Sequence, residues 1–373
     1  MVTVRAVASR QDRRRFIDVP YRLHKDLPNW VAPLRMETRK TLDPHRNPFF
    51  RHADTEMFLA KRDGRAVGRI TAQVDHRHNE RHGERTGMFG FFEAPDDPTV
   101  AAALVDAAQD WVRDQGMDRL QGPYSWSMHE YLGTLVHGFD TPPAIMMGHN
   151  PAYYDGLLQA AGLAKVKDLY AFRFRAGGFP DHVRTLYEEL RDDPAVTVRE
   201  IDMTRFEDEL RIVFEIYNEA WADNWGFVPI AEEEIRGIAK DLKQIVDPGL
   251  ALIAEIEGEP VGMAIAVPNV NEAIHDLDGR LGPVAMTKLL WRLKRGLRTA
   301  RLMLLGIRPE YRGMHSMAIL IKLYGRLDEH GLRTGIEWGE LSWTLEDNHK
   351  INESIRMTGA EHYKTYRIYG LPV

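Results

Sequence analysis

In the second half of the chain, apolar residues alternate with polar ones in short segments, and between these segments they recur at helical spacing. Alternation with a period of two predicts strands, and recurrence every three or four residues predicts amphipathic helices. The resulting order is a strand, two helices, a meander of strands, and then helix, strand, helix, strand. The predicted strands are 196–201, 250–256, 261–267, 302–307, 335–342 and 362–369, and the predicted helices are 206–221, 232–246, 316–330 and 348–357.

The first half repeats this order and also repeats short motifs. The turn Asp63-Gly64 returns as Glu257-Gly258, 194 residues later, and Asn150 returns as Asn348, 198 residues later. We therefore predict two copies of one domain, residues 1–176 and 177–373, each an α/β layer with a mixed, mostly antiparallel twisted sheet flanked by helices. The copies differ by insertions at 124–148 and at about 268–299. The strands expected in the first copy are 56–61, 67–74, 87–93, 118–122 and 167–174, and the helices are 99–115 and 151–161.

Composition narrows the function classes. The 373 residues are 44% hydrophobic and 28% charged, as in an ordinary globular protein, and the net charge of −6 argues against a general nucleic-acid binder. The absence of cysteine excludes disulfides and thiolate chemistry. The N-terminus lacks the apolar stretch of a signal peptide, and no apolar run is long enough for a membrane span. We expect a cytoplasmic protein.

The segment from Gly306 to Met317 reads Gly-Ile-Arg-Pro-Glu-Tyr-Arg-Gly-Met-His-Ser-Met and resembles the signature strand and pyrophosphate loop of the GNAT acyltransferase superfamily. The resemblance implies that acyl-CoA binds here, because a glycine-rich turn at a helix N-terminus points amides at an anion. His315 and Met317 replace two small residues of the family pattern, and Ile355 stands where many members have a tyrosine that protonates the thiolate. The alternative is a turn that only begins a core-packing helix. The residues implied to bind CoA are Ile307, Arg312, Gly313, Met314, His315, Ser316, Met317 and Asn348.

The first copy has no comparable loop, since residues 94–98 read Ala-Pro-Asp-Asp-Pro and are acidic. We expect the CoA site in the second copy, and we expect the first copy to be a substrate-shaping or structural partner. A narrower resemblance, carried by stretches such as 58–70, 148–154, 340–348 and 363–369, covers nearly the whole chain. These stretches are similar to a bacterial group of tandem GNAT proteins of the ceramide synthase type. That resemblance implies transfer of a fatty acyl group from acyl-CoA to a sphingoid or other long-chain amine.

Amine acylation requires a base, a donor for the thioester oxygen and a proton for the leaving sulfur. Without cysteine, direct transfer is the natural mechanism. Glu340 lies on a predicted central strand, where an unpaired carboxylate is costly to bury, and is therefore the candidate base. The alternative for Glu340 is a salt bridge to an arginine. His315 is a second candidate, as a proton relay at the mouth of the CoA site.

The insertion of the first copy mixes aromatic and polar residues, as the lining of a binding pocket does. We predict a substrate-binding set, for which the alternative is an ordinary structural loop. Metal binding is not expected, because arginines stand between His76, His78 and His82. The predicted substrate-binding residues are Trp126, His129, Glu130, His149 and Tyr154 from this region, with Ser342 from the second copy.

Residues 285–301 combine leucines at helical spacing with six basic residues and Trp291. This pattern predicts a basic amphipathic helix that lies in an anionic membrane surface, or else a core-packed helix with a solvated basic face. The first reading favours an enzyme in peripheral contact with the inner membrane. Three alternatives stay open: an acetyl-CoA-dependent N-acetyltransferase of small soluble amines, a Fem-type aminoacyl transferase, and a non-catalytic protein with decayed CoA sites. The Fem-type long helical arm has no counterpart in the sequence.

Overall fold

The computed structural model describes residues 1–243, 245–313 and 315–373, and the chain divides into two units. Unit 1 contains Met1–Leu169, Ile274–Leu289 and Lys364–Val373, and unit 2 contains Tyr170–Ala273 and Leu290–Tyr363. The boundary predicted after residue 176 separates the two copies of the sequence repeat. The division into units does not test this boundary, which stays a prediction. Some elements are divided between the units, among them β7 (Ala164–Arg175), α10 (Pro283–Arg295) and β13 (Glu361–Pro372).

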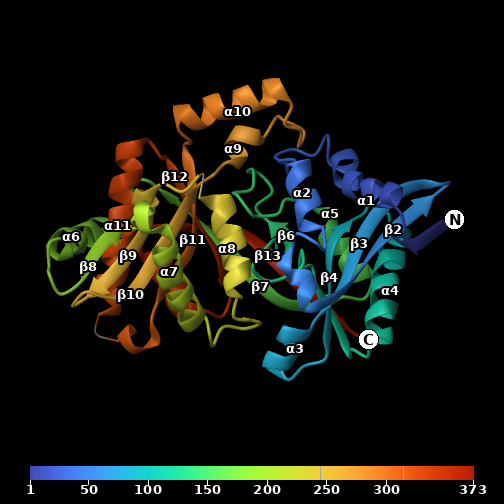
Figure 1. Cartoon of the computed structure of the whole chain (residues 1–373), viewed down its shortest axis with the longest axis horizontal. Helices are drawn as coiled ribbons and strands as arrows, with labels where there is room; N and C mark the ends of the chain where they lie inside the picture. The colour runs from blue at the N-terminus through green and yellow to red at the C-terminus, as the bar shows by residue number, and fades with distance from the viewer. Residues whose placement is uncertain (244, 314) are drawn as a thin grey trace. The chain divides into compact units, whose positions relative to one another are not determined.

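Unit 1 is built on strands in the order β1-β2-β3-β4-β5-β13, in which β4 and β5 are parallel and the other neighbours are antiparallel (Figure 1). Successive residues of β2 face opposite sides of the sheet. Leu59 packs with α1, and Ala60 packs with α4. The elements are β1 (Val2–Ala6), α1 (Arg10–Leu23), α2 (Arg35–Thr41), η1 (Pro48–Arg51), β2 (Ala53–Arg62), β3 (Arg65–Asp75), α3 (His76–His82), β4 (Thr86–Glu93), α4 (Pro98–Asp114), β5 (Arg119–Gly122), β6 (Thr134–His137) and α5 (Tyr153–Ala160).

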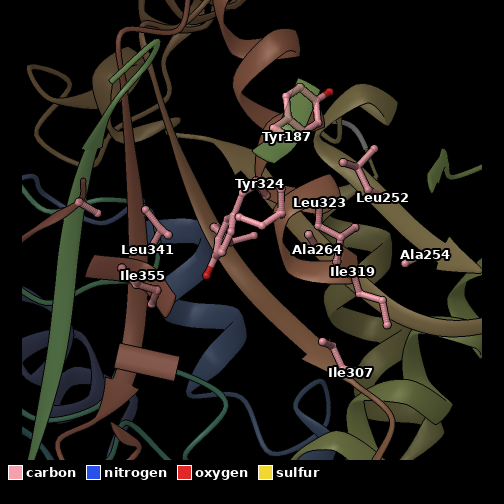
Figure 2. Close-up of a cluster of buried hydrophobic side chains, with 14 of the residues drawn as sticks. Tyr187, Leu252, Ala254, Ala264, Ile307, Ile319, Leu323, Tyr324, Leu341 and Ile355 are labelled. Carbon is pink, nitrogen blue, oxygen red and sulfur yellow. The ribbon is translucent and has the colours of Figure 1, made fainter. Parts of the chain in front are cut away.

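Unit 2 has the strand order β12-β11-β10-β9-β8, with β11 and β12 parallel. Leu252 of β9 packs with α11, and its neighbour Ile253 packs on the opposite side with α7. Figure 2 shows the α11 side of this core. The elements are α6 (Asp181–Leu190), β8 (Thr197–Glu200), η2 (Met203–Arg205), α7 (Phe206–Ala220), α8 (Glu232–Leu242), η3 (Pro248–Leu250), β9 (Ala251–Ile256), β10 (Glu259–Pro268), α9 (Asn271–Ile274), β11 (Thr299–Ile307), η4 (Pro309–Tyr311), α11 (Ser316–Thr334), β12 (Trp338–Leu345) and α12 (His349–Met357).

The same tight turn joins corresponding strands in the two units. Asp63-Gly64 has φ angles of 50° and 76°, and Glu257-Gly258 has φ angles of 53° and 83°. Two consecutive positive φ angles are the requirement of a type I′ hairpin turn, which explains the glycine in each. The turns connect β2 to β3 and β9 to β10. The predicted α/β fold class, with mixed, mostly antiparallel sheets flanked by helices, is confirmed.

The helix predicted over residues 285–301 is shorter than expected. Helix α10 ends at Arg295, and Gly296 follows with a φ of 90°, a left-handed conformation that ends helices. Residues 299–301 belong instead to β11, where Arg301 pairs with Val267 and Glu340. Two of the six basic residues, Arg298 and Arg301, therefore lie outside the helix. Among the helices of the described residues, none combines the length and apolarity that a membrane span needs.

Candidate active site

Strands β11 and β12 of unit 2 are paired only over part of their length. Paired positions run from Thr299 and Trp338 to Leu302 and Leu341, where the ladder of these two described strands ends. β11 continues for five residues to Ile307, and β12 continues to Leu345. Side chains at the end of the ladder therefore lie where two parallel strands diverge.

Glu340 stands opposite Arg301 in this ladder, and both side chains are buried, with 5% of each residue exposed. The Arg301 Nε donates to Ser342 Oγ at 2.9 Å, and the Ser342 hydroxyl donates to Glu340 Oε1. The Tyr363 hydroxyl donates to Glu340 Oε2. The guanidinium lies 3.8 Å from Glu340 Oε1 and offsets the cost of burying the carboxylate.

The contacts of this network fit both interpretations that the sequence allowed for Glu340. A salt bridge to an arginine is present, and so are two hydroxyls that are able to carry a proton to or from the carboxylate. A buried carboxylate bonded to ionisable or hydroxyl neighbours is a typical site of general acid–base chemistry. The network joins Glu340 and Ser342, both predicted, with Arg301 and Tyr363, neither of which was predicted as a site residue.

The predicted pyrophosphate loop leads into α11. The described residues of its first turn include no acidic side chain, and its cap residue His315 makes no side-chain hydrogen bond to the first-turn amides. The Ser316 hydroxyl donates backwards to the Gly313 carbonyl at 2.9 Å. Amides at the start of a helix that no side chain caps are suited to binding an anion. Arg312, by contrast, donates from Nε to the Ile307 carbonyl at 3.0 Å and also bonds the Ala220 carbonyl, so its guanidinium fixes the turn to α7.

The corresponding helix of unit 1, α4, differs at its N-terminus. Asp97 caps this helix by accepting from the Thr99 amide at 2.9 Å, and it also pairs with Arg62. The hydrogen bond from Arg62 is the largest cause that lowers the pKa of Asp97, which keeps the carboxylate charged. A carboxylate already occupies the place that a phosphate would take. The expectation that the CoA site lies in the second copy stays a prediction.

Two of the remaining residues implied to bind CoA, Asn348 and Ile307, have structural partners. Asn348 caps α12 through its side chain, which accepts from the Ile351 amide at 3.4 Å. Ile307 packs in the core beside α11, and Ile355 is buried in the same cluster (Figure 2). Met317 is 47% exposed. Met314 lies outside the described residues. The assignment of these residues to CoA stays a prediction.

The substrate-binding residues predicted from the first copy lie in unit 1, and two of them belong to its core. Trp126 is fully buried among Phe49, Phe50 and Phe91, and its Nε1 donates to the Thr41 carbonyl at 2.9 Å. Tyr154 is buried and donates to Glu93 at 2.8 Å. Such contacts are those of structural residues, so the alternative of an ordinary structural role explains both side chains.

His149, also predicted to bind substrate, is buried in unit 1. Its Nε2 lies 3.0 Å from the Pro28 carbonyl, and its Nδ1 has no hydrogen-bond partner. Burial, with the charge of Lys364 as the next cause, lowers the pKa of His149 to about 4. The imidazole is therefore neutral at neutral pH and donates from Nε2. His129 and Glu130 are half-buried in the insertion at 124–148. The His129 amide donates to Ser127 Oγ at 3.2 Å.

A second buried network in unit 1 was not predicted. His24 contacts Glu93 through Nε2, and Arg69 lies 3.3 Å from the other oxygen of Glu93. Burial alone would raise the pKa of Glu93, but His24, Arg69 and Tyr154 together outweigh it, and the net pKa is lowered. The partners are separated by as many as 69 residues in sequence, so no local pattern indicated them.

An apolar pocket lies beside Glu340 in unit 2. Its walls come from α11, from the starts of β11 and β12, from β10 and η3, from the end of β7 and the segment after it, and from the residue that follows α12. Most of its lining is apolar, and several positions are glycine or alanine. The lining residues are Phe174, Ala176, Phe179, Leu250, Ala266, Ala300, Leu302, Tyr324, Leu327, Asp328, Gly331, Ile336, Gly339, Glu340, Leu341 and Thr358.

Comparison with known proteins identifies close relatives. A bacterial ceramide synthase of Caulobacter vibrioides (strain NA1000 / CB15N) is 41% identical over 373 residues, which cover 99% of this chain and 97% of the relative. Protein YghO of Escherichia coli (strain K12) is 40% identical over 370 residues, which cover 98% of this chain and 94% of that protein. A scan against models of protein families finds no match.

Solved structures give the same fold. A tandem GNAT protein from the clavulanic acid biosynthesis pathway aligns with a TM-score of 0.57 and 13% identity, over 100% of this chain and 98% of that one. A GCN5-related N-acetyltransferase from Sphaerobacter thermophilus aligns with a TM-score of 0.52 and 13% identity, over 100% of this chain and 95% of its own. Together with relatives at 40% and 41% identity along almost the whole chain, this fold leads to one assignment. The chain belongs to the bacterial ceramide synthase family of tandem GNAT acyltransferases.

Proposed function

We propose that this N-acyltransferase passes an acyl group from acyl-CoA directly to the amine of a long-chain lipid, with a sphingoid base as the best candidate. The observation that carries the proposal is the buried Glu340, held by Ser342, Tyr363 and Arg301 where β11 and β12 separate. The name of the Caulobacter relative supports the lipid amine.

In the proposed reaction, Glu340 takes a proton from the ammonium group of the acceptor. The neutral nitrogen attacks the thioester carbon, so that a C–N bond forms and the C–S bond breaks. The nitrogen loses its second proton to water as it becomes an amide, and the protonated Glu340 returns the first proton to the leaving thiolate, which becomes the free thiol. Because Ile355 replaces the tyrosine of many family members, we assign the return of this proton to the Tyr363 hydroxyl, which already bonds Glu340.

We also propose that the pyrophosphate of CoA binds the amides at the start of α11. Support comes from the uncapped first turn and from its lack of acidic residues among those described. Arg312 would hold the loop in shape through its bonds to Ile307 and Ala220, and we place no phosphate on its guanidinium. His315 and Ser316 lie where their amides can take part.

The acceptor class is tested by competition. When purified enzyme and a long-chain acyl-CoA are given sphinganine and spermidine together, we expect N-acylsphinganine as the product, because a lipid amine gains about 0.8 kcal/mol for each methylene that leaves water. Products are measured by mass spectrometry, with acetyl-CoA as the alternative donor. Acetylspermidine as the main product would replace the lipid proposal with the acetyltransferase of soluble amines, and no acylated product from any mixture would favour a non-catalytic protein.

We further propose that α10 contacts an anionic membrane surface, which places a cytoplasmic enzyme at the inner membrane. Four of its apolar side chains are exposed: Val284 by 83%, Met286 by 41%, Leu290 by 59% and Trp291 by 58%. An amphipathic helix with exposed leucine, tryptophan and basic residues suits the membrane interface. Of its basic residues, Lys288 pairs with Asp276 and Arg292 bonds the Ala273 carbonyl, whereas Lys294 and Arg295 are exposed beside Trp291.

The membrane contact predicts the effect of polar substitutions on this face. The double variant Leu290→Asn/Trp291→Asn should bind anionic liposomes at least about tenfold more weakly, since each side chain contributes on the order of 1–2 kcal/mol when buried. Leu332→Asn is the matched control, because Leu332 is 56% exposed on α11. Liposome co-sedimentation at low salt measures the difference. Equal binding by the double variant and wild type, or no binding by wild type, would rule out this role for α10.

A further inference from the structure

We propose that Arg173 binds an oxygen of the acceptor's polar head, a hydroxyl or a phosphate, next to the amine that Glu340 deprotonates. This inference rests on the proposed function and names the residue that distinguishes an oxygen-bearing lipid amine from a plain alkylamine. Arg173 is half-buried near the end of β7, in the part of this strand that belongs to unit 2.

Arg173 and Glu340 lie on the same face of the unit 2 sheet. The neighbours of Arg173 in β7, Phe172 and Phe174, pack in the core on the α11 side. Successive residues of a strand face opposite sides of the sheet, so Arg173 faces away from α11. Glu340 does the same, because its neighbour Leu341 packs in that core. The two side chains can therefore meet one ligand from one side of the sheet.

Two aromatic rings hold the guanidinium beside the Glu340 network. Its Cζ atom lies 4.6 Å from the ring centre of Trp338 and 5.6 Å from that of Tyr363. The same Tyr363 donates through its hydroxyl to Glu340 Oε2. One phenol side chain therefore spans the separation between the guanidinium and the carboxylate. A head group with nitrogen and oxygen on neighbouring carbon atoms covers a comparable separation when each atom makes one hydrogen bond.

The N–H groups of Arg173 have no acceptor among the described residues. None of those residues accepts a hydrogen bond from its guanidinium or forms an ion pair with it, and its buried Nε has no partner. Arg35, Arg69 and Arg308 also have an unpaired Nε, but each bonds a carboxylate through another nitrogen. A guanidinium that aromatic rings hold in place, with its N–H groups free, is suited to binding oxygen atoms of a ligand.

The charge of Arg173 indicates which part of the acceptor it meets. Arg301 lies 3.8 Å from Glu340 and balances its charge, so Arg173 adds a further positive charge on this face. A guanidinium repels an ammonium group, and a plain alkylamine would gain nothing from it. An oxygen next to the amine, by contrast, accepts from Arg173 while the nitrogen lies at Glu340.

The experiment compares three acceptors in mixed detergent micelles: sphinganine, sphinganine 1-phosphate, and 2-aminooctadecane, which has the same carbon skeleton and amine without oxygen. Arg173→Met removes every N–H donor and keeps an apolar side chain beside the two rings. For at least one oxygen-bearing amine, we expect its kcat/KM to fall by about 10- to 100-fold, the loss of one hydrogen bond from a charged group, and for 2-aminooctadecane by less than about threefold. The oxygen-bearing amine with the larger loss identifies the hydroxyl or the phosphate as the bound group.

Two further variants control for stacking and folding. Arg173→Lys keeps the charge beside the rings but has no planar fork of donors, so it should recover part of the loss. Arg356→Met is the matched control, because Arg356 also stacks on a ring, that of Phe172 at 5.3 Å, on the opposite face of β7. It should match wild type for all three amines. Thermal unfolding is measured for each variant, and calorimetry without acyl-CoA gives the affinity for each amine.

The outcomes separate this inference from the proposed function. Equal losses of kcat/KM on all three amines, or no loss on any, would overturn the inference even if acylation proceeds normally, because Arg173 would then act on the thioester, on the fold or not at all. If wild type acylates no amine but binds an oxygen-bearing amine more tightly than 2-aminooctadecane, and Arg173→Met abolishes that difference, the inference stands and the acyl-transfer proposal fails. If wild type neither acylates nor binds any of the three amines, both fail together.

Discussion

Glu340→Gln should lower the kcat of acyl transfer by about 10²- to 10⁴-fold, the range typical for loss of a general base. Glutamine has nearly the same shape, and its one carbonyl oxygen still accepts a hydrogen bond from Ser342 or from Tyr363, but it takes up no proton. The affinity for acyl-CoA should stay within about threefold of wild type, because Glu340 lies on β12 and the α11 amides that we assign to CoA come from another element. Stopped-flow detection of free thiol measures kcat.

The control must separate chemistry from stability, since the variant leaves Arg301 buried without its carboxylate, a loss that costs on the order of 3–5 kcal/mol in buried pairs. Thermal unfolding therefore accompanies each assay, at a temperature where the variant is folded. Glu337→Gln is the matched substitution, because Glu337 is exposed three residues away and pairs with Arg298. A folded Glu340→Gln enzyme with a kcat close to wild type would remove Glu340 from the reaction and leave it a structural ion pair.

Gly313→Pro should weaken CoA binding by about 10- to 100-fold, the loss expected for one hydrogen bond to a charged group. Proline removes the amide hydrogen that we assign to the pyrophosphate, and it fixes the backbone of the turn. Gly313→Ala is the matched control, since a Cβ at this position meets no atom within 4 Å and alanine keeps the amide. Calorimetric titration with CoA compares the three proteins.

If the proline and alanine variants bind CoA equally well, the amide of residue 313 plays no part and the turn only begins a core-packing helix. If both variants lose binding equally, the contribution comes from the flexibility of glycine rather than from its N–H group, and the assignment of the amide is again wrong. A role for the amide of residue 313 requires that the proline variant bind CoA more weakly than the alanine variant.

Local sequence patterns predicted the features that depend on a few neighbouring residues. The hairpin at Gly258 and the end of α12 before Gly359 both depend on a glycine with a positive φ. The sequence shows the glycine directly, and glycine is the residue that adopts this conformation most readily. Aromatic residues in a polar stretch were less informative. Trp126 and Tyr154 were predicted to bind substrate; both are buried in unit 1 with an internal partner for the polar atom, and their role in binding stays a prediction.

Features that depend on distant residues were not predicted. Arg301 continued the basic pattern of residues 285–301, and its burial follows only from the parallel register that places it opposite Glu340, 39 residues later. Tyr363 reaches Glu340 from yet another strand. The sequence therefore indicated one carboxylate of the network, and the arginine and tyrosine that hold it came from the pairing of strands. The pocket beside it has the same origin, since its walls come from segments spread between residues 174 and 358.

The most direct measurement is the product analysis of purified wild-type enzyme with one equivalent of palmitoyl-CoA and excess sphinganine. Mass spectrometry should find N-palmitoylsphinganine and free CoA in equal amounts, with no mass added to the protein at any time point, because direct transfer forms no acyl-enzyme. Glu340→Gln under the same conditions should give almost none of either product. Release of CoA with free palmitate and no amide, or an unchanged mixture after prolonged incubation, would contradict the proposed acyl transfer.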